Sequence, residues 1–119
     1  MGDLLEEIPQ QKEIVLIPFF FSDLKQTKTR PAIIISKNIY NETNQDIIVM
    51  PLTTNLRKLE YNIQIDNEDL EKGFLIKQSE IRVDKIYSIN QNLIIMKIGI
   101  VNQEIIEKLI KNLITLLTN

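Results

Sequence analysis

The sequence predicts a single α+β domain in which short, mostly antiparallel strands are followed by one C-terminal helix. Apolar, β-branched runs too short for helices recur between polar turn segments over residues 13–96. After Gly99 the period changes, and apolar residues fall on one face of a helix from residue 102 onward. The length of 119 residues, with 44% hydrophobic and 25% charged residues, suits one folded domain over residues 1–119.

The first strand is expected at residues 13–21, after a loose N-terminal arm at residues 1–11. Pro18 cannot donate to a strand ladder, so it indicates an edge position, a bulge or the end of this strand. Residues 22–29 are polar and cationic, which predicts a connecting loop.

The middle of the chain carries the remaining strands and their turns. An apolar run at residues 30–36 predicts a core strand, and Pro31 favours an extended Arg30 at its entry. Gly73, where a positive φ is readily adopted, is expected to end a helical turn. The other expected elements are a polar turn at 38–45, a strand at 46–52, a cationic loop at 53–58, a half-exposed strand at 61–65, a helical turn at 66–72, and strands at 74–83, 86–89 and 93–96.

The C-terminal helix is predicted by the spacing of its apolar residues. Asn102 is a suitable N-cap, and Glu104 and Glu107 lie in the first turns, where the helix dipole favours acids. The apolar stripe consists of Ile105, Ile106, Leu109, Ile110, Leu113, Ile114, Leu116 and Leu117. Such a helix must cover the apolar face or the open end of a small sheet or barrel.

The residue types present exclude several kinds of chemistry. The chain has no Cys and no His, which excludes thiolate nucleophiles, imidazole bases, catalytic triads and zinc sites ligated by Cys or His. The three glycines do not stand at P-loop or dinucleotide spacing, and the acidic run at residues 66–71 indicates a solvated turn rather than a calcium loop. We therefore expect no metal and no cofactor, and any catalysis has to use carboxylates, hydroxyls, Lys, Arg or Tyr.

The distribution of charge permits only a local positive surface. A net charge of −2 argues against a long nucleic-acid groove. The cations of the middle fall at or near expected loops and strand ends: Lys25, Lys28, Arg30, Arg57, Lys58, Lys77, Arg82 and Lys85. The acidic start is unlike a secretory signal and no apolar run reaches membrane-spanning length, so a soluble, cytoplasmic protein without a membrane partner is expected.

Four parts of the chain, in the same order, resemble the MazF/PemK family of toxin endoribonucleases. They are residues 14–24 (IVLIPFFFSDL) with 30–36 (RPAIIIS), residues 46–55 (DIIVMPLTTN), residues 75–85 (LIKQSEIRVDK), and residues 97–99 (KIG) before the helix. Each motif is weak alone, but the four in register are specific over nearly the whole chain. The resemblance implies a small SH3-like, mostly antiparallel barrel with a C-terminal helix, in a protein that is usually a homodimer.

The resemblance also implies a function, namely metal-independent cleavage of single-stranded RNA by the toxin of a type II toxin–antitoxin pair. The RNA 2′-hydroxyl attacks the phosphate, generally leaving a 2′,3′-cyclic phosphate and a 5′-hydroxyl. A cognate antitoxin with a flexible acidic segment neutralises the enzyme. The family's catalytic Arg and Thr map onto Arg30 and Thr53. Expected RNA contacts are Lys25, Lys28, Thr54, Asn55, Lys77 and Ser79. Asp23 is a candidate for proton transfer, although an Asp that follows Ser at a strand end is more typical of a residue that stabilises a turn.

The chemistry of these residues suits that reaction except in proton transfer. A guanidinium offers a planar fork to two phosphate oxygens, and a threonine hydroxyl donates a further hydrogen bond. Arg30 stays protonated, however, and is a poor general base. Lys77 and Ser79 stand where some relatives have Arg and Asp, and Lys25 stands where others have Glu, so the carboxylates of those relatives are missing.

Two other functions stay open on the sequence: a non-catalytic relative that binds DNA gyrase, and an inactive barrel that serves as a binding module. Without the resemblance, residues 53–55 are ordinary turn formers. Arg82 is expected to join an ion-pair cluster with Asp84 and Lys85 that holds strands together. The aromatic residues of the first strand are expected to divide between the core and a subunit contact: Phe19, Phe20 and Phe21.

Overall fold

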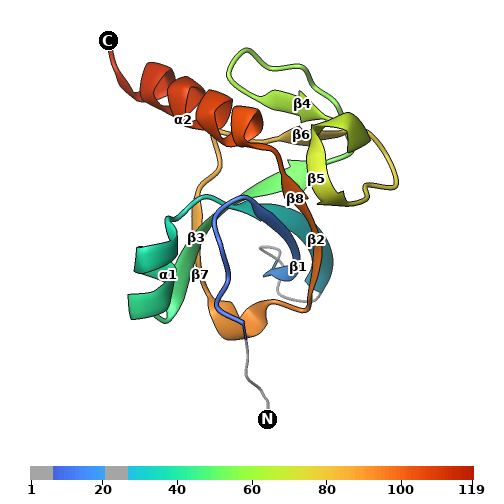
Figure 1. The fold of residues 1–119 in the computed structure, drawn as a ribbon. Helices are drawn as coiled ribbons and strands as arrows, with labels where there is room; N and C mark the ends of the chain where they lie inside the picture. Colours follow the sequence, from blue (N-terminus) through green and yellow to red (C-terminus); the bar gives the residue numbers. More distant parts are fainter. Residues whose placement is uncertain (1–6, 21–26) are drawn as a thin grey trace.

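The chain folds as one curled antiparallel sheet, a half-barrel, with a helix across one face (Figure 1). The computed structural model describes residues 7–20 and 27–119. The elements in order are β1 (Glu13–Phe20), β2 (Thr27–Ile34), α1 (Asn38–Thr43), β3 (Asp46–Thr53), β4 (Ile63–Ile65), the 3-10 turn η1 (Asn67–Asp69), β5 (Leu70–Gly73), β6 (Ser79–Ile81), β7 (Tyr87–Asn90), the 3-10 turn η2 (Gln91–Leu93), β8 (Met96–Val101) and α2 (Gln103–Leu117). The strand order is β4-β6-β3-β2-β1-β8-β5, and β7 also pairs with β3. The predicted α+β class with a C-terminal helix is confirmed.

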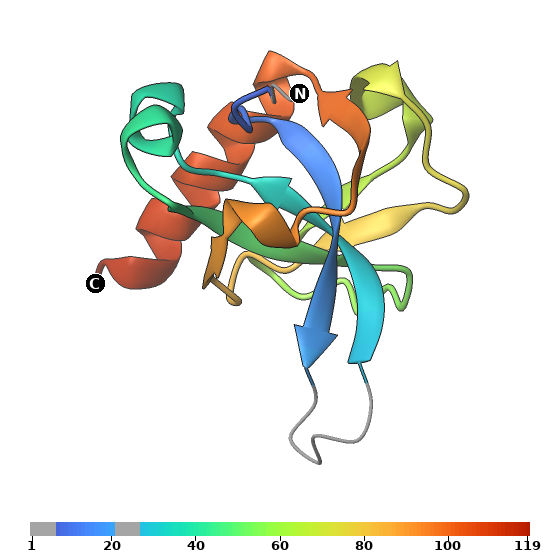
Figure 2. The same ribbon diagram turned by 90° about the horizontal axis from the view of Figure 1, so that it is seen from below.

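The three central strands are buried on both faces. β1 pairs with β2, and β2 with β3, in antiparallel register; β1 and β2 extend together past the other strands (Figure 2). Successive side chains of a strand point to opposite faces, so a strand covered on both sides needs an unbroken apolar run. This explains why residues 14–17 and 32–35 show no polar alternation.

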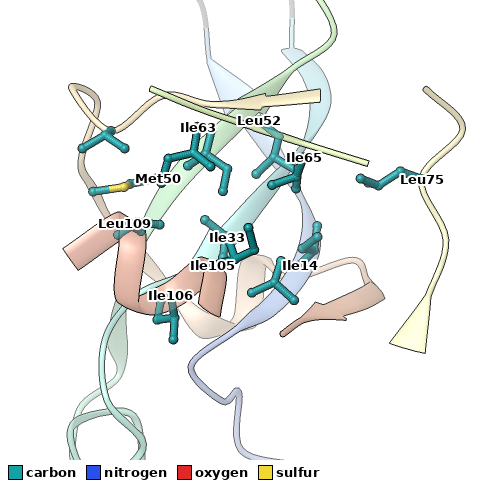
Figure 3. Packing of buried hydrophobic residues seen from close by; sticks show 13 residues of the cluster. Ile14, Ile33, Met50, Leu52, Ile63, Ile65, Leu75, Ile105, Ile106 and Leu109 are labelled. Carbon is teal, nitrogen blue, oxygen red and sulfur yellow. The ribbon is translucent and has the colours of Figure 1, made fainter. Parts of the chain in front are cut away.

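The larger core lies between the sheet and α2. Ile105, Ile106 and Leu109 of the helix pack against Ile33 of β2 and Met50 of β3 (Figure 3). Strand side chains complete this cluster, together with two residues outside the strands: Ile14, Leu52, Ile63, Ile65, Leu75, Ile81, Val83 and Val101. The helix therefore covers one face of the sheet, as its apolar stripe predicts.

A second, smaller core occupies the opposite face of the central strands. It consists of Val15, Ile17, Ala32, Ile34, Ile47 and Val49. Phe19 packs against this cluster, and its ring meets that of Tyr87 edge-on with ring centroids 5.4 Å apart. Because β2 and β3 separate β1 from β7 in the strand order, this contact requires the sheet to curl over the second core.

Two prolines mark changes in strand pairing. Pro18 lies two residues beyond Leu16, which forms the last pair of β1 with β8, so β1 is at an edge there, as predicted. Pro51 does not end β3, which was expected at residues 46–52 and continues to Thr53. The partner changes instead, since Ala32 of β2 is opposite Pro51 whereas the two residues that follow pair with β6.

Residues 38–45 and the start of the chain differ from expectation. The predicted polar turn contains the short helix α1, whose Asn41 is buried. The Asn41 amide donates to the carbonyls of Pro9 (3.0 Å) and Ser36 (3.1 Å), and its Oδ1 accepts from the Ser36 hydroxyl (2.6 Å). Pro9 is itself buried, so residues 7–11, the described part of the expected loose arm, pack onto the fold.

Three other segments are shorter or shifted. The helical turn predicted at 66–72 is only η1, capped by Asp66, and β5 follows it. Of the strand predicted at 74–83 only β6 forms. The strand predicted at 93–96 is replaced by β8, which begins at Met96, the last residue of the predicted range.

Two glycines allow the close pairing of β5 with β8. Gly73 has φ +84°, as predicted, and lies opposite Gly99. A Cβ at Gly99 would stand 2.7 Å from the Lys72 carbonyl.

α2 begins as predicted. The Asn102 side chain accepts from the Ile105 N–H at 3.1 Å, which satisfies one of the unpaired donors of the first turn. On the outer side, Ile110, Ile114 and Leu117 are 43%, 57% and 71% exposed. None of the described helices is long and apolar enough to cross a membrane.

Candidate functional site

Arg30 and Thr53 occupy matching positions where β2 and β3 part. The pairs between these strands end at Ala32 with Pro51, and each candidate lies two residues beyond that pair. Because side chains alternate along a strand, Arg30 shares a face with Ala32, and Thr53 shares one with Pro51. Both therefore project from the same face of the sheet, just past the place where the β2–β3 pairs end.

Prolines limit the pairing at this point. Pro31 has no N–H and cannot donate a ladder bond, and the Pro51 carbonyl faces away from β2, where it accepts from the Arg82 N–H at 3.0 Å. Beyond them, Thr53 pairs with Glu80 of β6, whereas Arg30 stays paired with β1. Arg30 therefore lies in the part of the sheet formed by β1 and β2, and Thr53 in the part formed by β3 and β6. These two parts separate beyond the Ala32–Pro51 pair.

The hydroxyl of Thr53 is oriented by the turn that follows it. The backbone N–H of Asn55 donates to Thr53 Oγ1 at 3.1 Å, which uses one lone pair. A hydroxyl has one donor and two acceptor sites, so its O–H can still donate. Thr53 and Arg30 are half-buried, while Thr54 and Asn55 are exposed. The turn-forming interpretation of residues 53–55 and a donor role for Thr53 are thus compatible.

Lys28 extends the cationic face of β2. It is exposed and stands two residues before Arg30, so alternation puts both side chains on one face. Lys25 and Asp23, expected in RNA binding and proton transfer, lie outside the described residues.

Three of the other expected RNA contacts, but not Asn55, line a separate groove of about 820 Å³. Thr54, Lys77 and Ser79 border it together with Pro31 and mainly apolar side chains: Leu16, Phe74, Leu75, Ile76, Met96 and Ile98. Pro31 projects from the face opposite Arg30. The expected contacts are therefore divided between two faces, which the sequence does not predict.

Ser79 is poorly placed to contact a ligand. Its side chain is only 3% exposed, and its hydroxyl donates to the Lys77 carbonyl at 3.1 Å. Lys77 itself is exposed. The Ser79 hydroxyl is therefore held within the fold, and its expected contact with RNA stays a prediction.

The Arg82 ion pair is present but local. Arg82 Nε and Nη2 donate to Asp84 Oδ1 and Oδ2, each at 3.0 Å. This pairing raises the pKa of Arg82 and lowers the pKa of Asp84, and the charge of Lys85 lowers the latter further. Since Arg82 and Asp84 are two residues apart, the pair shapes its own segment and does not link strands, contrary to the expected role.

Glu80 lies opposite Thr53 in the sheet, but the sequence predicts no role for it. Its side chain is fully buried, and its oxygens accept from the Lys58 N–H and from Asn62 Nδ2, each at 2.8 Å. Burial raises the pKa of Glu80, but these bonds and the backbone N–H groups of Leu59 and Arg57 outweigh it, so the pKa is lowered. The neighbouring residues 77–82 (KQSEIR) are mostly polar, so no local signal in the sequence shows that Glu80 is buried.

The comparison with protein families gives one match that spans nearly the whole chain. A model of the PemK-like, MazF-like toxin of type II toxin-antitoxin systems matches residues 10–117. The matched range includes both Arg30 and Thr53. Among curated proteins, none matches the chain significantly.

Solved structures share the fold. An endoribonuclease from a mycobacterial species has a TM-score of 0.73 at 18% identity, covering 94% of this chain and 93% of that one. A MazE–MazF structure from Deinococcus radiodurans (form II) has a TM-score of 0.76 at 16% identity, covering 94% and 97%. The Mycobacterium tuberculosis toxin MazF-mt6 has a TM-score of 0.69 at 20% identity, covering 85% and 91%. At these identities the likeness establishes the fold alone.

Proposed function

Because the chain belongs to the PemK-like, MazF-like toxin family of type II toxin-antitoxin systems, we propose that it is a toxin that cleaves single-stranded RNA without a metal ion. The observation that carries this proposal is the placement of Arg30 and Thr53 on one face, each two residues past the last β2–β3 pair. The shared fold with a mycobacterial endoribonuclease supports it.

In the proposed reaction the RNA supplies its own nucleophile. The 2′-oxygen forms a bond to the adjacent phosphorus, and the bond from phosphorus to the 5′-oxygen of the next nucleotide breaks. The 2′-hydroxyl gives its proton to a base, and the departing 5′-oxygen takes up a proton. The products are a 2′,3′-cyclic phosphate and a 5′-hydroxyl. DNA lacks the 2′-hydroxyl and is not a substrate for this chemistry.

The protein has to stabilise the charge that builds on the phosphorane. Arg30 presents two parallel N–H donors to phosphate oxygens, and Thr53 adds its hydroxyl proton. Donors that are held in place before the reaction need no reorganisation in the transition state. The Asn55 bond to Thr53 Oγ1 serves this purpose by fixing the hydroxyl oxygen.

Proton transfer is assigned to Asp23 within this proposal. Arg30 stays protonated at ordinary pH and cannot accept the proton. Glu80 is close to Thr53 in the sheet but is fully buried with both oxygens hydrogen-bonded, so it is not the base. Asp23 belongs to the motif that precedes Arg30 in the sequence.

The proposed partners are a second copy of the chain and a cognate antitoxin with a flexible acidic segment. An endoribonuclease from a mycobacterial species was solved in complex with its cognate antitoxin, and MazF of Deinococcus radiodurans was solved together with MazE. Exposed Lys28 and Lys77 offer charges complementary to an acidic segment. Several large apolar side chains are exposed and suited to a subunit interface: Phe74, Ile76, Met96, Ile114 and Leu117.

The test is cleavage of a mixed-sequence, single-stranded RNA by the purified protein in the presence of EDTA. We expect cuts that leave 5′-hydroxyl and 2′,3′-cyclic phosphate ends, and no cut where a single 2′-deoxynucleotide replaces the nucleotide on the 5′ side of the scissile bond. Arg30→Ala and Thr53→Val should each lower the cleavage rate by roughly 100-fold, the cost of losing one preorganised donor.

Thr115→Val is the matched control, because Thr115 lies on the exposed surface of α2 and donates only to the Lys111 carbonyl. It should cleave like the wild type. Intact RNA alongside inhibited DNA supercoiling would support the gyrase-binding alternative instead. Intact RNA with normal supercoiling would support an inactive binding module.

A further inference from the structure

Glu80 is a fully buried carboxylate beside the proposed cleavage site. It has no exposed surface, although it lies in β6 directly across from Thr53 of β3. Its Oε1 accepts from the Lys58 N–H and its Oε2 from Asn62 Nδ2, each at 2.8 Å. Burying a charge costs free energy unless hydrogen bonds compensate for the lost hydration. The hydrogen bonds of a buried carboxylate at this position therefore point to a structural role.

These bonds fasten the loop that follows Thr53. Lys58 has φ +57°, a left-handed conformation that a non-glycine residue keeps only when its surroundings impose it. Asn62 also connects the loop to the segment after β6, because its Oδ1 accepts a hydrogen bond from the Val83 N–H at 3.0 Å. The loop of residues 54–62 is thus tied to β6 and to the segment after it by contacts that converge on Glu80.

The same loop controls the Thr53 hydroxyl. Asn55, whose N–H holds Thr53 Oγ1 at 3.1 Å, lies between Thr53 and the anchor at Lys58. A displacement of the loop at Lys58 also displaces the Asn55 N–H, since only two residues lie between Asn55 and Lys58. The geometry at one end of the loop therefore depends on the carboxylate at the other end.

We propose that Glu80 is the positioning residue of the cleavage site, which fixes residues 54–62 so that the Thr53 hydroxyl and the exposed Thr54 and Asn55 meet the RNA in one arrangement. This inference rests on the proposed endoribonuclease function. Glu80 acts through Thr53 and the loop and does not touch the substrate, because its oxygens are enclosed.

The ionised form of Glu80 is the one that the surroundings accept. Besides Lys58 and Asn62, the backbone N–H groups of Arg57 and Leu59 face the carboxylate, and successive N–H groups of this kind make an anion-binding concavity. The charged side chain of Arg82 also interacts electrostatically with Glu80. These groups favour the anion, so the anchor is in place at neutral pH.

Glu80→Gln is the discriminating substitution. Glutamine has the same shape, but only one of its two terminal atoms accepts hydrogen bonds. Its NH2 group must then face a donor, either the Lys58 N–H or Asn62 Nδ2. Glu60→Gln makes the same chemical change at an exposed position in the same loop and is the matched control.

The first measurement does not depend on RNA cleavage. Amide hydrogen exchange should become roughly tenfold faster or more at Lys58 and Asn55 in Glu80→Gln, and stay unchanged in Glu60→Gln. Unchanged exchange at these two amides in Glu80→Gln would overturn the proposal. If Glu80→Gln does not fold, Asn62→Ala, which removes only one of the bonds to Glu80, carries the same measurements.

The second measurement separates positioning from stability. At saturating RNA, well below the unfolding temperature, kcat of Glu80→Gln should fall roughly tenfold or more, because small displacements of catalytic groups are costly, while KM changes little. A core truncation such as Ile106→Val, which lies on α2, lowers stability without this loss of kcat.

Faster exchange with an unchanged kcat would reduce Glu80 to a stabilising residue and overturn the positioning role. If the wild type itself leaves RNA intact, the proposed function fails. Hydrogen exchange then still decides whether Glu80 anchors the loop.

Discussion

At the scale of single residues, the candidate site depends on the shape of Arg30 as well as its charge. Arg30 lies inside β2 (Thr27–Ile34), where it pairs with Ile17 of β1 and precedes the part of the strand that is buried from Ala32 onward, so its backbone is fixed by the sheet and not at the strand entry where it was expected. A planar guanidinium can bind two phosphate oxygens at once, whereas the ammonium of a lysine is a point charge without that geometry.

Arg30→Lys is therefore expected to lower the cleavage rate by roughly 100-fold, as the loss of a preorganised donor does, although the charge is retained. Steady-state kinetics on a short single-stranded RNA with one cut site would measure this. Arg57→Lys, an exposed change outside the strands, should stay within about threefold of the wild type. A rate for Arg30→Lys close to that of the wild type would show that charge alone suffices.

At the scale of elements, α2 illustrates a helix that its sequence specifies well. Its N-cap, its acidic first turn and its apolar stripe all agree with the helix that forms. The helix supplies three buried side chains to the larger core: Ile105, Ile106 and Leu109. Local signals and tertiary packing therefore favour the same structure.

Asn102→Ala should lower the free energy of unfolding by about 1 kcal/mol, the usual cost of losing an N-cap side chain. Urea denaturation followed by circular dichroism would measure it. Asn102→Asp, which keeps an acceptor oxygen and adds a charge that the helix dipole favours, should restore the stability. A loss in Asn102→Asp equal to that in Asn102→Ala would contradict the capping role.

α1 illustrates the opposite case. Three of the eight residues at 38–45 are Asn, a residue that favours turns, and the sequence accordingly predicts a turn. The buried Asn41 side chain instead bonds to Pro9 and Ser36, and the Gln91 side chain donates to the Asn41 carbonyl at 3.0 Å. Hydrogen-bond partners that lie 5 to 50 residues away in the chain stabilise this helix. Such contacts cannot be predicted from the propensities of residues 38–45 themselves.

At the scale of the whole molecule, ionised groups that are hydrogen-bonded or paired in the folded chain set how stability depends on pH. Glu80 and Asp84 have lowered pKa values in the folded chain. Such carboxylates stabilise the fold above their unfolded pKa, and this contribution is lost as pH falls through the folded pKa. Lys97 bonds to Glu13 Oε2 (2.8 Å) and Glu7 Oε1 (2.6 Å); burial lowers its pKa, but these bonds outweigh burial and raise it.

We therefore expect a stability plateau through neutral pH, a decline below roughly pH 4, where glutamates begin to protonate, and a second decline in strongly alkaline solution as Lys97 loses its proton. Denaturation curves measured across this range would test it. The acidic decline should be shallower in Glu80→Gln, because that variant has one carboxylate fewer to protonate. An equally steep decline in both proteins would assign acid sensitivity to other groups.

The sequence by itself determined what depends on neighbouring residues and on composition. The apolar runs of β1, β2 and β3, the position of Pro18 at an edge, the positive φ of Gly73 and the start of α2 follow from local sterics and periodicity. The absence of Cys and His limited the chemistry, and the motifs around Arg30 and Thr53 gave the family resemblance.

Only the tertiary structure decided what depends on distant partners. The exchange of β2 for β6 beyond Pro51, the helix at Asn41 and the burial of Glu80 all result from contacts between segments far apart in the chain. It also decided which residues share a face, separating Arg30 and Thr53 from the groove that Thr54 and Lys77 line. A residue's type fixes the bonds it can make, but only the fold determines which groups lie close enough to make them.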